Sequence, residues 1–291
     1  MLRYDSMRNF IVAVFFLLAV PTLLPAADIQ IPENLDAKVN VLKSERDGLW
    51  EKSLVVQFAE KRRSLGTIDG FVDAYAVLNH SAHPLLWQKV SQKFMGQDGR
   101  GGKRYTEFMQ QNVADDLKLK KADINKMATA ANMDNLAVVT KECKPLTVTV
   151  LATAGAKTNA IRTGVDECPY IEGQEPKGTI NIVLLTNAVL TDGAMARAII
   201  TVTEAKTAAL EDLKVPSSYT KNVQATGTGT DSVIVVSGTT GPKATYTGGH
   251  SKLGEMIGKA TYEAVVEALG KQNGFLLPGV KPYVTESSKK N

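Results

Sequence analysis

Three apolar, β-branched segments alternate with long helical segments in the C-terminal half of the chain, and this alternation restricts the fold more than any other feature. The apolar segments are LTVTVLATAG (146–155), GTINIVLLT (178–186) and DSVIVVSG (231–238). One helix is predicted from Thr191 to about Leu213, and another from His250-Ser251 to about Gly270. Strands this apolar need cover on both faces. We therefore expect an α/β or α+β fold, with helices packed on a sheet.

The preceding region, residues 28–145, reads as mostly helical. It contains AKVNVLKSERDGLWEKSLVVQFAEKRRSLG (37–66), followed by TIDGFVDAYAVLNHS (67–81), in which Phe71, Ala74 and Leu78 recur at helical spacing. The chain has 291 residues and 44% apolar content, enough to bury a substantial core. We expect one domain over residues 28–291, with a mostly helical N-terminal part (28–145) and an α/β core (146–270).

The first 27 residues have the pattern of a signal peptide. Arg3 and Arg8 precede an apolar run from Phe10 to Leu24, and small residues allow cleavage after Ala26 or Ala27. The run is short for a membrane-spanning helix, which needs about 20 apolar residues, and it contains a proline. We expect an exported protein, periplasmic or extracellular, without a stable membrane anchor after cleavage. An uncleaved anchor and a start at Met7 are the alternatives.

Export would give the two cysteines a role. In an oxidising compartment Cys143 and Cys168 can pair as a disulfide, which would stabilise the fold by about 3 kcal/mol; two separate free thiols are the alternative. The net charge of +4 is small and forms no concentrated basic face, so nucleic-acid binding is not expected.

Threonine and glycine alternate just before the last apolar segment, in ATGTGTDSVIVVSG (225–238). Thr226, Thr228 and Thr230 offer hydroxyl groups, Gly227 and Gly229 let the backbone come close to another group, and Asp231 follows. Such a segment is either a loosely held loop or a backbone that lies against something.

The predicted helix 191–213 carries a lysine within its apolar stripe. Lys206 must extend to solvent, pair with an acid or face a cavity, whereas Glu204 lies on the opposite, polar face.

His250 precedes the last predicted helix in GGHSKLGE, where a loop could present it to a ligand or Ser251 could simply cap the helix. The other histidines, His80 and His83, read as structural or surface residues.

Four blocks of sequence, in this order, resemble the adenosylcobinamide amidohydrolase (CbiZ) family. They are LATAGAKTNAIRTG (151–164), GTINIVLLTNAVLTDGAMARAIITVTEAKTAALEDL (178–213), ATGTGTDSVIVVSG (225–238) and GGHSKLGEMIGKATYEAVVEAL (248–269). A weaker similarity covers SLGTIDGFVDAYAVLNH (64–80). The resemblance implies hydrolysis of the amide between a corrin side chain and aminopropanol, which gives adenosylcobyric acid for cobalamin salvage. It implies no separate cofactor, because the cobalt belongs to the corrinoid substrate.

Within the matched blocks, residue type suggests roles. His250 is the first candidate for the general acid or base, Asp231 or Glu204 would orient it or activate water, and Lys206 or backbone N–H groups would stabilise the oxyanion. A threonine nucleophile is a weaker alternative. Candidates for substrate binding are Asn159, Asn181, Thr226, Gly227, Thr228, Gly229, Thr230 and Lys252.

Corrinoid salvage takes place in the cytoplasm, so the export signal leaves two further alternatives open. An exported chain could be a non-catalytic corrinoid-binding protein that feeds an uptake system. The signal-like segment could also be an anchor or a wrongly assigned start. A corrinoid is the expected partner in either case.

Overall fold

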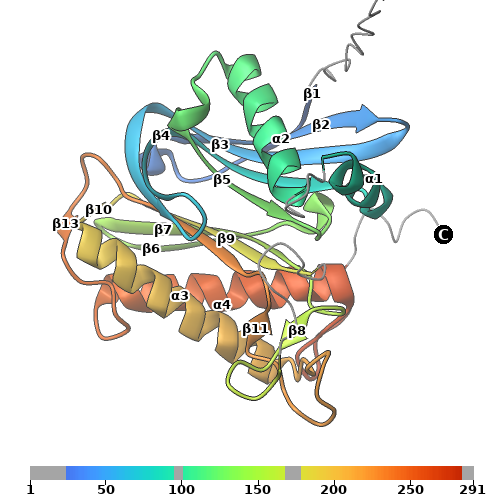
Figure 1. Cartoon of the computed structure of the whole chain (residues 1–291). Helices are drawn as coiled ribbons and strands as arrows, with labels where there is room; N and C mark the ends of the chain where they lie inside the picture. Colours follow the sequence, from blue (N-terminus) through green and yellow to red (C-terminus); the bar gives the residue numbers. More distant parts are fainter. Residues whose placement is uncertain (1–23, 95–100, 168–177, 284–291) are drawn as a thin grey trace, which may run out of the picture.

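A nine-stranded sheet forms the centre of the protein, and it curls until its two halves face each other (Figure 1). The computed structural model describes residues 24–94, 101–167 and 178–283. The strands of the sheet are β1 (Leu24–Ile29), β2 (Ala37–Arg46), β3 (Leu49–Gly66), β4 (Gly70–Ala82), β5 (Ile124–Thr129), β6 (Ala137–Cys143), β7 (Leu146–Ala154), β9 (Ile180–Thr186) and β12 (Ser232–Val236). The main order is β1-β2-β3-β12-β9-β7-β6, with β4 beside β3 and β5 beside β4.

In the described part of the chain, four α-helices pack on the sheet. They are α1 (Pro84–Phe94), α2 (Gly101–Leu117), α3 (Asp192–Asp212) and α4 (Lys252–Asn273). Figure 1 shows α3 and α4 against the half that contains β6, β7 and β9, and α2 over the half that contains β4 and β5. Two small ribbons complete the fold, β10 (Val189–Leu190) with β13 (Lys243–Ala244) and β8 (Ala160–Ile161) with β11 (Gly227–Thr228).

The hydrophobic core follows these layers. Apolar residues of β2, β3, β4 and β5 meet those of β7, β9 and β12 between the two halves of the sheet. The outer face of β7, β9 and β12 packs on α3 and α4, and the outer face of β3, β4 and β5 packs on α2. Each central strand is therefore buried on both faces, as its apolar sequence requires.

The predicted elements of the C-terminal half are confirmed. The three apolar segments are β7, β9 and β12, and the two predicted helices are α3 and α4. Thr191 caps α3 by accepting from the backbone N–H of Ala194, and Ser251 caps α4 by accepting from that of Gly254. The sheet is mixed, because β12 runs parallel to β9 and antiparallel to β3.

The prediction of a mostly helical region over residues 28–145 is wrong. Strands β2, β3 and β4 fill residues 37–82, and the helices of this region are α1 and α2. Asp47 and Gly48, both with positive φ (53° and 70°), form the two-residue turn between β2 and β3, which is a strong hairpin signal. The helical spacing in residues 67–81 is coincidental, because alternate residues of β4 face two different cores.

Residues 1–23, which hold most of the predicted signal peptide, lie outside the described residues. Within the described ranges no helix is long and apolar enough to cross a bilayer. Cys143, at the end of β6, is an exposed free cysteine, and Cys168 also lies outside the described residues, so the structure does not show the predicted disulfide.

Candidate functional site

One edge of the curled sheet gathers most of the polar groups that the sequence singled out. Strands β4, β5 and β7 end at this edge, whereas β9 and β12 begin there. The threonine–glycine segment before β12 is therefore brought beside the segments that follow β7 and precede β9. Ligands of open α/β sheets bind outside the carboxyl ends of parallel strands, and at this edge those are the ends of β4 and β5.

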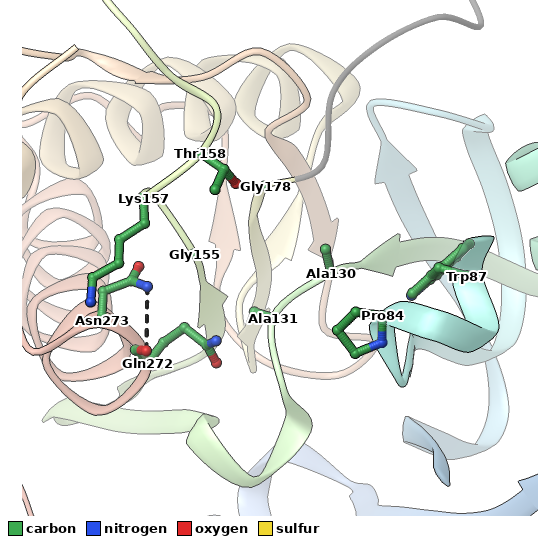
Figure 2. Close-up of a pocket in the computed structure, with 10 residues that line it drawn as sticks. All are labelled: Pro84, Trp87, Ala130, Ala131, Gly155, Lys157, Thr158, Gly178, Gln272 and Asn273. Carbon is green, nitrogen blue, oxygen red and sulfur yellow. Dashed lines mark hydrogen bonds between the residues drawn. The ribbon is translucent and has the colours of Figure 1, made fainter. Parts of the chain in front are cut away.

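A cavity of about 330 Å³ opens at the same edge. Pro84 and Trp87 of α1 lie on one side, and Lys157, Gln272 and Asn273 lie on the other (Figure 2). The remaining lining residues are mostly small: Ala130, Ala131, Gly155, Thr158 and Gly178. The cavity is within the size range of ligand pockets but far smaller than a whole corrinoid, so it suits one edge or one side arm of such a molecule.

Lys206 forms an ion pair with Asp231, which selects one of the three alternatives left open by the sequence. Both side chains are largely buried, with exposed fractions of 10% and 16%. Asp231 also accepts from the backbone N–H groups of Thr228 and Ile180, each at 3.0 Å, and from the Thr228 hydroxyl. Its two oxygens thus take four donors. Asp231 consequently holds Lys206, β11 and the start of β9 together.

The structure explains why positions 227 and 229 of the GTGT segment are glycine. A Cβ atom on Gly227 would lie nearer to Asp231 Oδ2 and Lys206 Nζ than the 3.0 Å that real Cβ atoms keep. A Cβ on Gly229 would lie 3.0 Å from Asn159 Oδ1. The segment is therefore a backbone that lies closely against an ion pair and a buried amide, and not a loose loop.

The threonines of this segment tie the two loops at the edge together. Thr230 donates to the carbonyl of Gly178, a residue that lines the cavity, at 2.7 Å. The Asn159 side chain donates to the same carbonyl at 2.9 Å and accepts from the hydroxyl of Tyr219 at 2.8 Å. Thr226 accepts from the backbone N–H of Thr163 at 3.0 Å. These contacts join the loop that carries Asp231 to Gly178 in the cavity wall.

Asn181 lies deeper, in a buried polar network between the two halves of the sheet. Its side-chain N–H groups donate to Asn79 of β4 and to the carbonyl of Ala128 at 2.9 and 2.8 Å. Asn79 in turn donates to Thr153 of β7 at 3.0 Å. With 0% exposure, Asn181 joins the two layers and does not face the cavity.

His250 lies at the opposite edge of the sheet, where α3 and α4 begin. The nearby Thr247 donates to the carbonyl of Ala194 in the first turn of α3, and Lys206 is about 18 Å further along that helix at 1.5 Å per residue. His250 and Lys252 are exposed, and the latter pairs with Glu255 in its own helix turn. Glu204 is exposed on the outer face of α3. The structure does not bring these three residues to Asp231.

A second polar cluster, which the sequence analysis missed, lies behind Trp87. His80, Tyr105 and Glu51 are almost completely buried, at 0%, 0% and 1% exposure. Burial lowers the pKa of His80 to about 3, and burial next to the Glu51 carboxylate raises that of Tyr105. His80 was interpreted as structural or surface, and it is structural. The period-2 pattern of β3 and β4 would have placed Glu51, Ser53 and His80 on one face.

The described residues include no group of three or more His, Cys, Asp or Glu side chains that could hold a metal ion. The side chains described at this edge of the sheet supply amide, hydroxyl and ammonium groups and the Asp231 carboxylate, which accepts four donors. Such groups suit recognition of a neutral, amide-bearing ligand and stabilisation of negative charge.

These features define a mixed α/β protein with a polar edge that contains a cavity, and comparison with known proteins gives its family. The profile of the adenosylcobinamide amidohydrolase (CbiZ) family matches residues 37–276, and the chain belongs to this family. It is 45% identical, over 79% of its length and 91% of the relative, to an uncharacterized protein of Methanocaldococcus jannaschii. It is 32% identical, over 49% of its length and 64% of the relative, to an adenosylcobinamide amidohydrolase of Methanosarcina mazei.

Similarity to solved structures is weak. A protein of Pyrococcus horikoshii OT3 superposes over 86% of this chain and 82% of its own, with a TM-score of 0.34 and 12% identity.

Proposed function

We propose that this protein hydrolyses the amide bond between a corrin side chain and aminopropanol in adenosylcobinamide or a related corrinoid. The products are adenosylcobyric acid and aminopropanol. Membership of the family supports this reaction. The observation that carries the proposal is the Lys206–Asp231 pair, a largely buried ammonium whose partner Asp231 directly follows Thr230, the residue that donates to Gly178 of the cavity wall.

In the proposed reaction, water adds to the amide carbonyl carbon and the resulting oxyanion is stabilised by Lys206. An ammonium group has three N–H donors, and the Asp231 contact uses one. A partly buried, pre-positioned positive charge stabilises an oxyanion more than it would in water. The C–N bond then breaks, and the nitrogen of aminopropanol takes up the proton that the water gives.

Asp231 serves in this proposal as the anchor of Lys206. Its oxygens already accept four donors, so proton abstraction from water would disrupt the loop that they hold. Thr230 and Gly178 form the adjoining surface against which the amide-bearing arm lies, and the buried Asn159 amide holds Gly178 in place.

The test is incubation of the purified protein with adenosylcobinamide, with aminopropanol and adenosylcobyric acid measured by mass spectrometry. We expect both products from the wild type. Lys206→Met should lower kcat by about 10²- to 10³-fold, the usual effect of losing one oxyanion donor. Lys259→Met, an exposed lysine of α4 that is 63% accessible, is the matched control and should leave kcat unchanged.

The other outcomes separate the alternatives. Full turnover by Lys206→Met would remove this residue from the mechanism. A corrinoid that co-elutes with the wild type without product would make the protein a corrinoid-binding protein. If the wild type neither binds a corrinoid nor forms product, the proposed function is refuted.

A further inference from the structure

Trp87 forms a wall of the cavity to which the proposed reaction assigns no role. Its indole lies across the cavity from Lys157 and Gln272 (Figure 2). Between these two sides the lining is mostly small, with Ala130, Ala131, Gly155 and Gly178. The cavity is thus a slot with an aromatic ring on one side and polar groups on the other, which suits a flat ligand edge with polar substituents.

Two buried rings hold the indole. The Tyr105 ring lies edge-on to Trp87 with centroids 4.9 Å apart at 87°, and the His80 ring lies 6.1 Å away at 60°. These are the favourable edge-to-face arrangements of aromatic pairs. Because Tyr105 and His80 are completely buried, the aromatic cluster faces the cavity through Trp87.

Hydrogen bonds fix the two supporting rings. The Tyr105 hydroxyl donates to Glu51, whose carboxylate also accepts from Arg46 Nε and Ser44 Oγ, each at 3.1 Å. His80 Nε2 lies 3.1 Å from the same hydroxyl, and His80 Nδ1 lies 2.9 Å from Ser53 Oγ. The support thus runs from β2 and β3 through α2 to Trp87 on α1. A ring held in this way pays little ordering entropy when a ligand binds.

The opposite wall presents hydrogen-bond donors to the slot. Gln272 Oε1 accepts from the Asn132 backbone at 3.0 Å and from Asn135 Nδ2 at 2.7 Å, which fixes the amide and leaves its NH₂ group as a donor. The exposed Lys157 makes no ion pair with any described residue. The donors on this wall match the carbonyl oxygens of a carboxamide fringe.

We infer that Trp87 is a specificity-determining residue that packs on the flat edge of the corrin, with Lys157 and Gln272 donating to its carboxamides and Tyr105 acting as the positioning residue of the indole. This inference rests on the proposed function, because the corrinoid is the ligand it places in the slot.

The chain has two tryptophans, so a Trp50→Phe background makes fluorescence report on Trp87 alone. We expect adenosylcobinamide to quench this fluorescence saturably, with a midpoint near KM. In the enzyme assay, Trp87→Leu should raise KM about tenfold and change kcat less than threefold, whereas Trp87→Phe should stay within threefold in both. Trp50→Phe, whose ring contacts Lys52 and His83 and does not line the slot, is the matched control and should be unchanged.

Tyr105→Phe tests the support, because it keeps the ring and removes the hydroxyl. We expect KM to rise about threefold at constant kcat, and the fluorescence anisotropy of Trp87 to fall in the Trp50→Phe background. A purely structural role would lower thermal stability and leave KM and anisotropy unchanged, and that result would overturn the positioning role.

The kinetic and fluorescence experiments distinguish an error in the inferred role of the slot from an error in the proposed function. Wild-type turnover with an unchanged KM in Trp87→Leu would overturn the slot alone, as would a Trp87 fluorescence that does not respond to a corrinoid that is hydrolysed. A wild type that neither binds nor hydrolyses any corrinoid would overturn the proposed function and this inference with it.

Discussion

His80 shows how one residue can make the stability of the fold depend on pH. Its imidazole is completely buried on β4, between Ser53 of β3 and Tyr105 of α2, with Arg46 and Glu51 close by. Burial, with the Arg46 charge as a smaller cause, lowers its pKa to about 3. The ring is consequently neutral in the folded protein at pH values well above 3.

We predict that this histidine makes the protein less stable in mild acid. Its folded-state pKa lies below the unfolded value of about 6.5, so the unfolded chain binds the proton first as pH falls. The unfolding free energy therefore keeps its full value above pH 6.5 and decreases between pH 6.5 and 3. At pH 5 the loss from this residue is about 2 kcal/mol, at 1.36 kcal/mol per pH unit.

Urea denaturation at pH 7 and pH 5 measures this effect. His80→Gln, which keeps a polar side chain and cannot take up a proton, should lose less stability between the two pH values than the wild type. His83→Gln, a partly exposed histidine next to the start of α1, is the control and should behave as the wild type. Equal losses in the wild type and His80→Gln would contradict the assignment.

Arg62 links secondary-structure elements, because its side chain joins three other segments of the chain to β3. The guanidinium is 3% exposed and donates to the carbonyls of Ser237, Leu35 and Thr186 at 2.7, 2.7 and 2.8 Å. Those carbonyls lie just after β12, in the short turn before β2 and at the end of β9. Burial lowers the pKa of Arg62 to about 10, so the group is still charged at neutral pH.

We predict that Arg62→Met lowers the unfolding free energy by about 3 kcal/mol or more, because three buried carbonyls lose a charged donor and each unsatisfied group costs about 1–3 kcal/mol. Chemical denaturation at pH 7 gives the value. Arg63→Met is the matched neighbour: Arg63 is 40% exposed and pairs with Asp192 and Asp73, so its loss should cost less than about 1 kcal/mol. Equal effects of the two substitutions would show that Arg62 does not join the elements.

The sequence predicted the elements of one half of the molecule and failed in the other, for physical reasons. Strands β7, β9 and β12 are short, β-branched and bounded by turn residues, and α3 and α4 have capping residues. Strands β2 and β3 instead carry many Lys, Glu and Arg residues, which favour helix. Tertiary pairing of β3 with three strands overrides that propensity, and the Asp47-Gly48 turn is the local signal that predicts it.

At the scale of the whole molecule, the predicted site residues lie at two opposite edges of the sheet, and the sequence alone could not show this division. Asn159, Asp231 and the GTGT segment were predicted as site residues and lie together, because each is within a few residues of a strand end, and Lys206 joins them from α3 through its ion pair with Asp231. His250 belongs to a matched block of sequence, but the block is mostly α4. A helix of 22 residues is about 33 Å long, so its two ends lie at opposite edges of the sheet.

The last prediction follows from this division and reverses the role that residue type suggested for His250. If the reaction takes place at the edge that holds Lys206 and the cavity, His250→Ala should keep kcat and KM within about threefold of the wild type. The imidazole lies at the start of α4, exposed to solvent, whereas the helix ends at Gln272 and Asn273 in the cavity wall. Steady-state kinetics with adenosylcobinamide measure the effect, with Lys206→Met assayed in parallel as the variant expected to fail. A loss of activity in His250→Ala as large as that in Lys206→Met, with thermal stability retained, would move the reaction to the edge where α3 and α4 begin. The cavity beside Trp87 would then bind a part of the corrinoid that is distant from the scissile amide. That arrangement requires the bound corrinoid to extend from one edge of the sheet to the other.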